Sequence, residues 1–265
     1  MREEAARRAV IKDPAGYRGC QQKQPYTSPP QSVVPWPKEW PIFPRANWPE
    51  MIRERQWKLL TDLTRGKIGV HNQRSTSRCW VHGSVRSMEL LRIYEGQPSL
   101  MLSPDSVAYP IEGTRDRGGY PSDACDQLAI GGACPMDAWP EAELSPKNAA
   151  KNWKEQALNH ALLRWVKVST WQQQITLGIL RIPIAIGLGW WGHLVCQVDP
   201  VIISKAEVGI DFDNSWGADW GENGSGILDE ESGTADLGAF APTDFTLPLQ
   251  FSLPLRFVVW TIPLP

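Results

Sequence analysis

The strongest constraint on the fold is a change of periodicity about halfway along the chain. Helical patterns, with apolar residues three or four positions apart, run through the first half, whereas short β-branched or alternating runs bounded by Gly, Pro and Asp fill the second. No internal repeat is visible. Helices followed by strands predict an α+β fold in which two lobes are separated by a cleft.

The expected helices have apolar residues spaced along one face, with charges between them. They are 48–65, Cys79–Tyr94, Pro121–Ile130 and Asn148–Trp165. The expected strands are Ile182–Leu188, His193–Ile203, Val208–Phe212 and Phe257–Ile262. We therefore expect a mainly helical first half and a β lobe in the second.

Residues 1–42 differ in character from the rest of the chain. They mix charge, Gln and Pro and end in the Pro- and Trp-rich run Val34–Pro41, where each proline removes a hydrogen-bond donor and disfavours a preceding helix. We expect 1–42 to be an extended arm and 43–265 to be one domain. The tail after Gly233 resembles no pattern that we can place.

Composition excludes several classes of protein. The chain of 265 residues is 42% hydrophobic, enough to bury one large core or two small lobes. Lys plus Arg number 27 against 29 Asp plus Glu, so charge gives no reason to expect nucleic acid or an anionic membrane as a partner. The most apolar stretches are interrupted by Pro or Gly and fall short of the roughly 20 residues that a membrane-spanning helix needs.

Cysteine usage and the N-terminus favour the cytoplasm or another reducing compartment. The five cysteines are an odd number spread over a long chain. We expect Cys125 and Cys134 to be two buried thiols rather than a disulfide. The charged run Met1–Arg8 leads into no apolar core, so no signal peptide is expected.

Cys79 lies where a polar turn, Asn72–Arg78, meets the start of an expected helix. Backbone N–H groups and the helix dipole favour negative charge at that position, so a thiol there is stabilised as the reactive thiolate. Taken alone, a cysteine in a helical pattern is more often a small core residue. The local pattern therefore leaves both a nucleophilic and a structural role open.

Two motifs resemble the papain-like (C1-type) cysteine peptidase family. Gln73 precedes Cys79-Trp80 with the family's spacing of Gln, five residues, Cys-Trp. The block 214–224, Asn-Ser-Trp-Gly-Ala-Asp-Trp-Gly-Glu-Asn-Gly, matches the family's Asn-Ser-Trp-Gly-x-x-Trp-Gly-Glu-x-Gly almost residue for residue. The resemblance covers about residues 43–228. It implies a helical left lobe that carries the nucleophile helix and an antiparallel, barrel-like right lobe.

A catalytic base has to lie between these two motifs. Gly192-His193 opens an apolar strand and matches the family's Gly or Asp followed by His, so His193 is the candidate. The weaker candidates are His71, His82 and His160. His82 lies one turn after Cys79, where a contact is geometrically feasible. A side chain on the same helix points back along the axis, however, so we expect His82 to pack.

The resemblance also implies a mechanism. Cys79 attacks a peptide carbonyl to form a thioester, His193 transfers the proton, and Asn214 orients the imidazole. Gln73 and the backbone N–H of Cys79 donate to the oxyanion. Trp216 shields the His–Asn hydrogen bond from water. The resemblance implies no cofactor and no metal.

A third stretch resembles a substrate-binding segment of the same family. Arg117–Pro121 is similar to the family's Asn-Gly-Gly-Tyr-Pro. Gly118 and Gly119 would then bind a substrate backbone, while Tyr120 and Pro121 form one wall of the pocket for the side chain two residues before the cut. We expect Trp190 and Trp191 to line or cap the opposite wall.

The sequence also departs from the family pattern. Thr76 and Asp116 stand where the family usually has two disulfide-bonded cysteines, and the interval from Cys79 to His193 is shorter than the expected 130–150 or so residues. The arm before residue 43 is too short to resemble the long inhibitory propeptide of lysosomal members. Either activity needs no zymogen, or the arm itself covers the cleft.

Three functions remain open from the sequence. The first is a cysteine-type peptidase, with polypeptide as its substrate. The second is a non-catalytic papain-fold module for binding or assembly, for instance in a larger particle such as a virion, with the arm or tail as docking element. The third is an acyl-transfer or deamidating enzyme with the same triad. The intact set Gln73, Cys79, His193 and Asn214 argues against the second.

Overall fold

The computed structural model describes residues 32–55, 60–64, 66–205 and 207–245. Its α-helices are α1 (Trp48–Arg55), α2 (Leu60–Thr64), α3 (Cys79–Tyr94), α4 (Pro104–Glu112), α5 (Pro121–Ile130), α6 (Trp153–Leu158), α7 (Trp171–Ile179) and α8 (Glu230–Gly233). Its strands are β1 (Val33–Val34), β2 (Leu162–Val168), β3 (Ile184–Leu188), β4 (His193–Ser204), β5 (Glu207–Asp213), β6 (Ser225–Leu228) and β7 (Ala239–Phe245). Two short 3-10 helices lie at Arg45–Asn47 and Pro146–Asn148.

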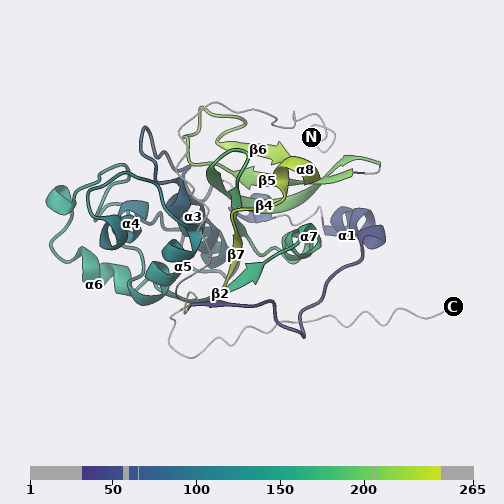
Figure 1. Cartoon of the computed structure of the whole chain (residues 1–265), viewed down its shortest axis with the longest axis horizontal. Coiled ribbons are helices and arrows are strands. Elements are labelled where there is room, and N and C mark those ends of the chain that lie inside the picture. The colour runs from purple at the N-terminus through teal and green to yellow at the C-terminus, as the bar shows by residue number, and fades with distance from the viewer. Residues whose placement is uncertain (1–31, 56–59, 65, 206, 246–265) are drawn as a thin grey trace.

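The molecule has a helical side and a sheet side (Figure 1). Helices α4, α5 and α6 lie together on the left, and the sheet with α1, α7 and α8 lies on the right. The sheet has seven strands in the order β1-β2-β7-β3-β4-β5-β6, and every neighbouring pair except β1–β2 is antiparallel. The described residues therefore form the expected α+β arrangement of two lobes.

Each lobe has its own hydrophobic core. The right-lobe core packs α7 against β3, β4 and β5, through residues such as Ile175, Ile186 and Phe212. The left-lobe core joins α3, α4 and α5 with β2 and includes Trp80, Leu128 and Trp165. Removing this apolar surface from water stabilises both lobes at about 25 cal/mol per Å².

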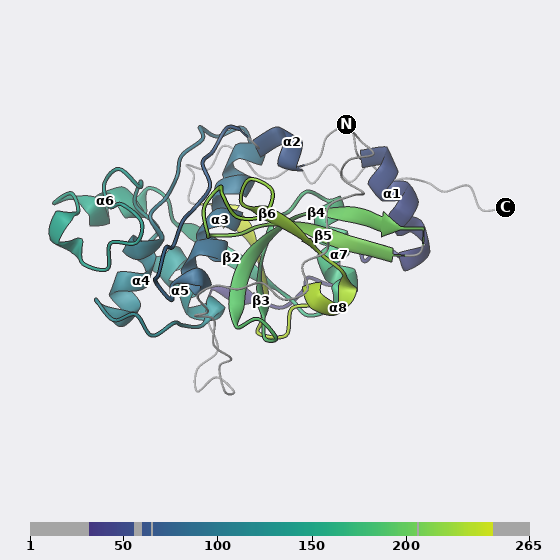
Figure 2. The ribbon, with the colours of Figure 1, turned by 90° about the horizontal axis from the view of Figure 1, so that it is seen from above.

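Helix α3 lies between the two lobes and packs directly on β3 and β4 (Figure 2). This contact depends on Gly83, because a Cβ atom there would lie 2.3 Å from the Leu194 side chain and 3.0 Å from the Val195 carbonyl oxygen. Cys79, Ala185 and Leu194 form a small buried cluster at the same junction. The first residue of α3 is thus held against the strands of the other lobe.

The described part of the arm lies along the outer edge of the sheet. Val33 and Val34 pair in parallel with Trp165 and Val166 of β2, and both the backbone N–H and the hydroxyl of Ser32 donate to Asp126. Trp36 and Trp40 then pack against the right-lobe core. Residues 32–42 are therefore an ordered part of the fold, and residues 1–31 lie outside the described residues.

Most of the expected elements are confirmed. Cys79–Tyr94 and Pro121–Ile130 are helices with the expected bounds, the described parts of 48–65 are helical, and the strands β3, β4 and β5 match their expected positions. The expected strand at Phe257–Ile262 and the tail beyond Phe245 lie outside the described residues. No described helix has both the length and the apolar character to cross a membrane.

The helix expected over Asn148–Trp165 is wrong. Only Trp153–Leu158 is α-helical there, and the chain then enters β2 at Leu162. β2 pairs with β1 on one side and β7 on the other, and it buries Leu162 and Trp165 completely. Sheet pairing at this position outweighs the local helical periodicity.

Candidate active site

Cys79 is the first residue of α3 and is completely buried. N–H groups at this end of a helix point out of the helix, which favours a negatively charged sulfur. The preceding residue, Arg78, is also fully buried and bonds to Asp105, to Glu112 (3.0 Å) and to the Gly113 carbonyl (2.9 Å). Arg78 therefore fixes the turn that delivers the cysteine to the lobe junction.

His193 begins β4 and makes a hydrogen bond to Asn214. The Nε2 atom of His193 lies 2.7 Å from Oδ1 of Asn214, and both residues are buried. Oδ1 also accepts a bond of 2.8 Å from the Ser215 N–H, which fixes the amide with its oxygen toward the ring. A neutral imidazole oriented in this way donates from Nε2, so its basic nitrogen is Nδ1.

Two tryptophan rings enclose the His193 imidazole. The ring centroids of Trp191 and Trp216 each lie 4.7 Å from that of His193, and the two indoles meet edge to face at 5.3 Å. Trp191 is fully buried, whereas Trp190, stacked on it, is 40% exposed. The ring of Trp191 packs on the imidazole and that of Trp190 is the exposed one, and the pocket-lining role expected of both stays a prediction. The position of Trp216 is the one expected of a shield.

Gln73 is held against the segment that carries Asn214. The Gln73 N–H donates to the Ser215 carbonyl (2.7 Å), and the Ser215 hydroxyl donates to the Gln73 amide oxygen (2.6 Å). One N–H of the amide donates to the Thr76 carbonyl at 2.5 Å, which leaves the second as a donor for another acceptor. Ser215 was not singled out from the sequence, although it lies inside the motif at 214–224.

The expected substrate-binding segment lies beside the cysteine helix. Gly118 has a φ of 72°, a conformation that favours glycine, and a Cβ on Gly119 would lie only 2.5 Å from the indole of Trp80. Tyr120 caps α5, and Pro121 is its first residue. The two glycines thus allow a backbone segment to pass directly over the residue that follows Cys79.

Comparisons with known proteins identify the fold. No protein-family model and no curated protein sequence matches the chain. Among solved structures, xylellain, a cysteine protease from Xylella fastidiosa, aligns with a TM-score of 0.60 and 18% identity over 89% of this chain and 97% of its own. Bromelain from Ananas comosus aligns with a TM-score of 0.57 and 19% identity, over 70% and 97% of the respective chains. A digestive procathepsin L of Tenebrio molitor aligns with 0.55 and 16%, over 66% of each chain.

The chain has the papain-like fold. Within it, a polar contact lies where the family usually has a disulfide between the positions of Thr76 and Asp116. The Asp116 carboxylate accepts from the Ser77 N–H at 2.6 Å. Among the described residues, cysteines 79, 125, 134 and 196 form no disulfide, as expected for Cys125 and Cys134. Burial raises the pKa of Cys125 and Cys196 well above the ordinary thiol range, which keeps them protonated and unreactive.

The sequence ranked three other histidines below His193 as the candidate base. His160 follows α6 and is half-buried. His71 and His82 are both buried near Glu141, in a polar cluster that the sequence did not reveal. Burial, together with the charge on His71, lowers the pKa of His82 to about 3. Burial opposes protonation of His71, but Glu89 and Glu141 outweigh it and raise its pKa to about 9.

Proposed function

We propose that the protein is a cysteine-type peptidase that hydrolyses peptide bonds through a thioester acyl-enzyme. The observation that carries the proposal is the 2.7 Å bond between His193 Nε2 and Asn214 Oδ1, at the end of the strand that packs on Cys79. With Nε2 committed to Asn214, Nδ1 is the ring nitrogen that takes the thiol proton and later gives it to the leaving amine.

The negative charge that develops on the attacked carbonyl oxygen needs donors. The backbone N–H of Cys79, at the first position of α3, and the second N–H of the Gln73 amide supply them. Loss of one such donor typically lowers kcat by about 10² to 10³. Ser215 holds the Gln73 amide by its oxygen, which fixes the direction of the remaining donor.

The substrate in this proposal is an extended polypeptide. Gly119 packs against the indole of Trp80, so the segment with Gly118 and Gly119 lies next to the cysteine helix, where its main-chain groups would bind a substrate backbone. Cys79 and His193 are both completely covered by their neighbours. The proposal therefore requires that the groups covering Cys79 move when substrate binds.

The test combines covalent labelling with a digest. A thiol-directed epoxide is expected to modify the full chain once, at Cys79, and not the Cys79→Ala variant. The Cys125→Ala variant is the matched control, because that thiol is buried and protonated, and it should label like the parent. A peptide-library digest with the parent chain should release new N-termini.

Each result has one meaning for the proposal. Absence of labelling at Cys79 in the folded parent chain contradicts it and favours a non-catalytic papain-fold module. Labelling at Cys79 without cleavage of any peptide contradicts the peptidase assignment and favours acyl transfer or deamidation.

A further inference from the structure

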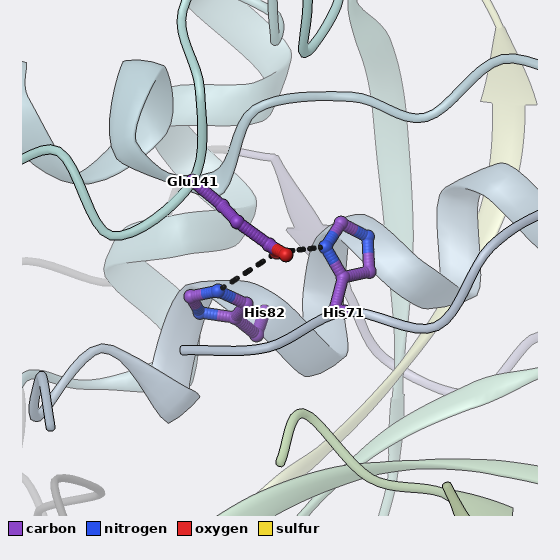
Figure 3. A group of neighbouring side chains, drawn as sticks. All are labelled: His71, His82 and Glu141. Carbon is purple, nitrogen blue, oxygen red and sulfur yellow. Dashed lines mark hydrogen bonds and ion pairs between the residues drawn. The ribbon is translucent and has the colours of Figure 1, made fainter. Parts of the chain in front are cut away.

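Three side chains next to the candidate active site converge on one point, as Figure 3 shows. They are His71, in the segment before Gln73; His82, on α3; and Glu141, in the loop before α6. His71 Nδ1 lies 2.8 Å and His82 Nε2 lies 3.8 Å from the same oxygen, Oε2 of Glu141. These two nitrogens and a carboxylate oxygen all lie within 4.8 Å of one another.

The remaining polar atom of each side chain is already held by a neighbour. His71 Nε2 lies 3.1 Å from both oxygens of Glu89, and His82 Nδ1 lies 2.8 Å from the Arg78 carbonyl. The other oxygen of Glu141, Oε1, accepts from the Asn72 N–H at 2.9 Å. A histidine whose outer nitrogen is bonded to a carboxylate or a backbone carbonyl is oriented as metal-binding histidines are.

His82 supplies an independent sign of a missing ligand. The residue is 1% exposed, and its Nε2 atom has no hydrogen-bond partner among the described residues. Leaving a buried nitrogen unsatisfied costs about 1–3 kcal/mol. The Arg78 carbonyl oxygen can only accept a hydrogen bond, so Nδ1 of His82 must carry the hydrogen. In this neutral tautomer, Nε2 has a lone pair that faces Glu141 and His71.

We propose that His71 Nδ1, His82 Nε2 and Glu141 Oε2 bind one divalent transition-metal ion of the Zn²⁺ class. Two ligands of a tetrahedral zinc ion, each about 2.0–2.1 Å from the metal, lie about 3.3 Å apart. The separations of 2.8 and 3.8 Å bracket that value, and the two histidine nitrogens lie within 4.8 Å of each other, so side-chain rotations bring the three ligand atoms to a common ion. A small cavity lined by both histidines, large enough for about one water molecule, adjoins the site and would supply the fourth ligand.

The charges around the cluster fit a divalent cation. Arg86 donates to Asp213 at 2.8 Å and to Glu89 at 3.4 Å. With Glu141, this gives three carboxylates and one guanidinium, and a proton on His71, or a metal ion in its place, offsets the excess of negative charge. Buried unbalanced charge is costly, and one divalent ion balances it. Nitrogen ligands favour Zn²⁺ or a similar metal over Ca²⁺ and Mg²⁺, which prefer oxygen.

The metal would join three parts of the papain-like fold. His82 lies on the helix that begins with Cys79, and His71 precedes Gln73 in a segment that pairs with residues 215–217. Glu141 belongs to a separate loop. The ion would hold the cysteine helix and the Gln73 segment in register without touching the substrate. This inference does not depend on peptidase activity.

The test uses the full chain with Cys79→Ala as background, so that the site is measured without the candidate nucleophile. After treatment with a chelator, this protein is titrated with Co²⁺, whose visible absorption reports tetrahedral coordination. We expect one Co²⁺ per chain with a Kd of about 1 μM or below, displacement by Zn²⁺, and a higher melting temperature of the loaded form.

Two variants identify the ligands, and a third is the control. His82→Gln and Glu141→Gln should each weaken Co²⁺ binding by at least about 100-fold, while circular dichroism shows that the metal-free variants are folded. His160→Gln removes a histidine outside the cluster and should leave binding unchanged. If either ligand variant is unfolded without metal, His82→Ala and Glu141→Ala replace it, read by the same titration.

Three results would overturn the inference. One is the absence of saturable Co²⁺ and Zn²⁺ binding up to about 1 mM, which would mean that a proton on His71 occupies the cluster. Another is an equal loss of affinity in His160→Gln and His82→Gln. The third is binding of Ca²⁺ or Mg²⁺ as tight as that of Zn²⁺.

Discussion

The Asp116 carboxylate accepts a hydrogen bond of 2.6 Å from the Ser77 backbone N–H, next to the position where papain-like enzymes usually have a disulfide. Arg78 strengthens the same connection, because its guanidinium bonds to Glu112 and to the carbonyls of Gly113 and Arg115. The turn before Cys79 is therefore joined to the loop after α4 by polar contacts alone, and these need no oxidising environment.

The first prediction concerns this polar joint. Arg78→Gln should lower the free energy of unfolding by about 3–5 kcal/mol, because it leaves the fully buried Asp105 carboxyl without its cation. Burial already raises the pKa of Asp105, with Arg78 acting in the opposite direction. Urea denaturation at neutral pH measures the effect.

Two control variants make the prediction specific. Arg78→Met combined with Asp105→Leu should recover part of the loss, since the fully buried Asp105 charge is removed together with its partner and only Glu112 is left without Arg78. Arg45→Gln breaks the exposed pair with Glu230 and should cost less than about 1 kcal/mol. Equal losses of unfolding free energy in Arg78→Gln and Arg45→Gln would contradict a stabilising role of the buried Arg78 contacts.

The elements that the sequence predicted well are those whose local pattern and tertiary contacts agree. Cys79–Tyr94 is a helix with the expected bounds because its apolar residues are buried along the length of the helix. At Asn148–Trp165 the local helical pattern and the tertiary contacts favour different structures. Leu162–Val168 is a strand because it pairs with β7, for example through Val166 and Val168. Local propensity alone does not predict where the preceding helix ends and this strand begins.

The candidate site shows the same division. The motifs in the sequence predicted Gln73, His193 and Asn214 as site residues, and the structure brings His193 and Asn214 into contact. The contacts of His71 with Glu89 and Glu141 join residues 18 and 70 positions apart, and Glu141 lies in a loop with no periodic pattern. Such contacts arise from chain packing, so neither propensity nor spacing could reveal them.

The second prediction separates positioning of His193 from other effects of Asn214. Asn214→Ala removes the acceptor of the 2.7 Å bond and should lower kcat/KM by about 100-fold. The loss should appear mainly in kcat, because substrate binding does not involve the outer nitrogen of the ring. Asn214→Asp keeps an acceptor at the same place and should retain most of the rate. The assay uses a peptide identified in the library digest, and equal loss in both variants would refute a positioning role.

The third prediction concerns the arm. A chain that starts at Phe43 loses the pairing of β1 with β2, the Ser32–Asp126 bonds and the packing of Trp36 and Trp40. Compared with a chain that starts at Ser32, it should be less stable by on the order of 2–4 kcal/mol. Thermal unfolding of the two truncated chains measures the difference.

The same pair of chains tests whether the arm covers Cys79. Val33 and Val34 pair with β2, which β7 and β3 separate from β4, the strand that carries His193. The sheet pairing, the bonds to Asp126 and the packing on the right-lobe core that hold residues 32–42 do not involve Cys79. Removing them should therefore not accelerate epoxide labelling. Faster labelling of the Phe43 chain than of the Ser32 chain, both folded, would show that this part of the arm shields the sulfur.

The fourth prediction concerns acid stability and His160. Burial, followed by the charge of Arg92, lowers the pKa of His160 from 6.5 to about 4, so the folded chain resists protonation that the unfolded chain accepts. The unfolded state therefore binds more protons between about pH 6.5 and about pH 4, and stability must fall as the pH decreases through that range. His160→Gln cannot take up this proton, so its stability should fall less over the same range.

Urea unfolding of both chains with a chelator present gives the comparison. Other acid-sensitive groups, such as His82, contribute equally to both chains and cancel in the difference. Parallel pH curves for the two proteins would show that His160 titrates in the folded chain as it does in the unfolded one.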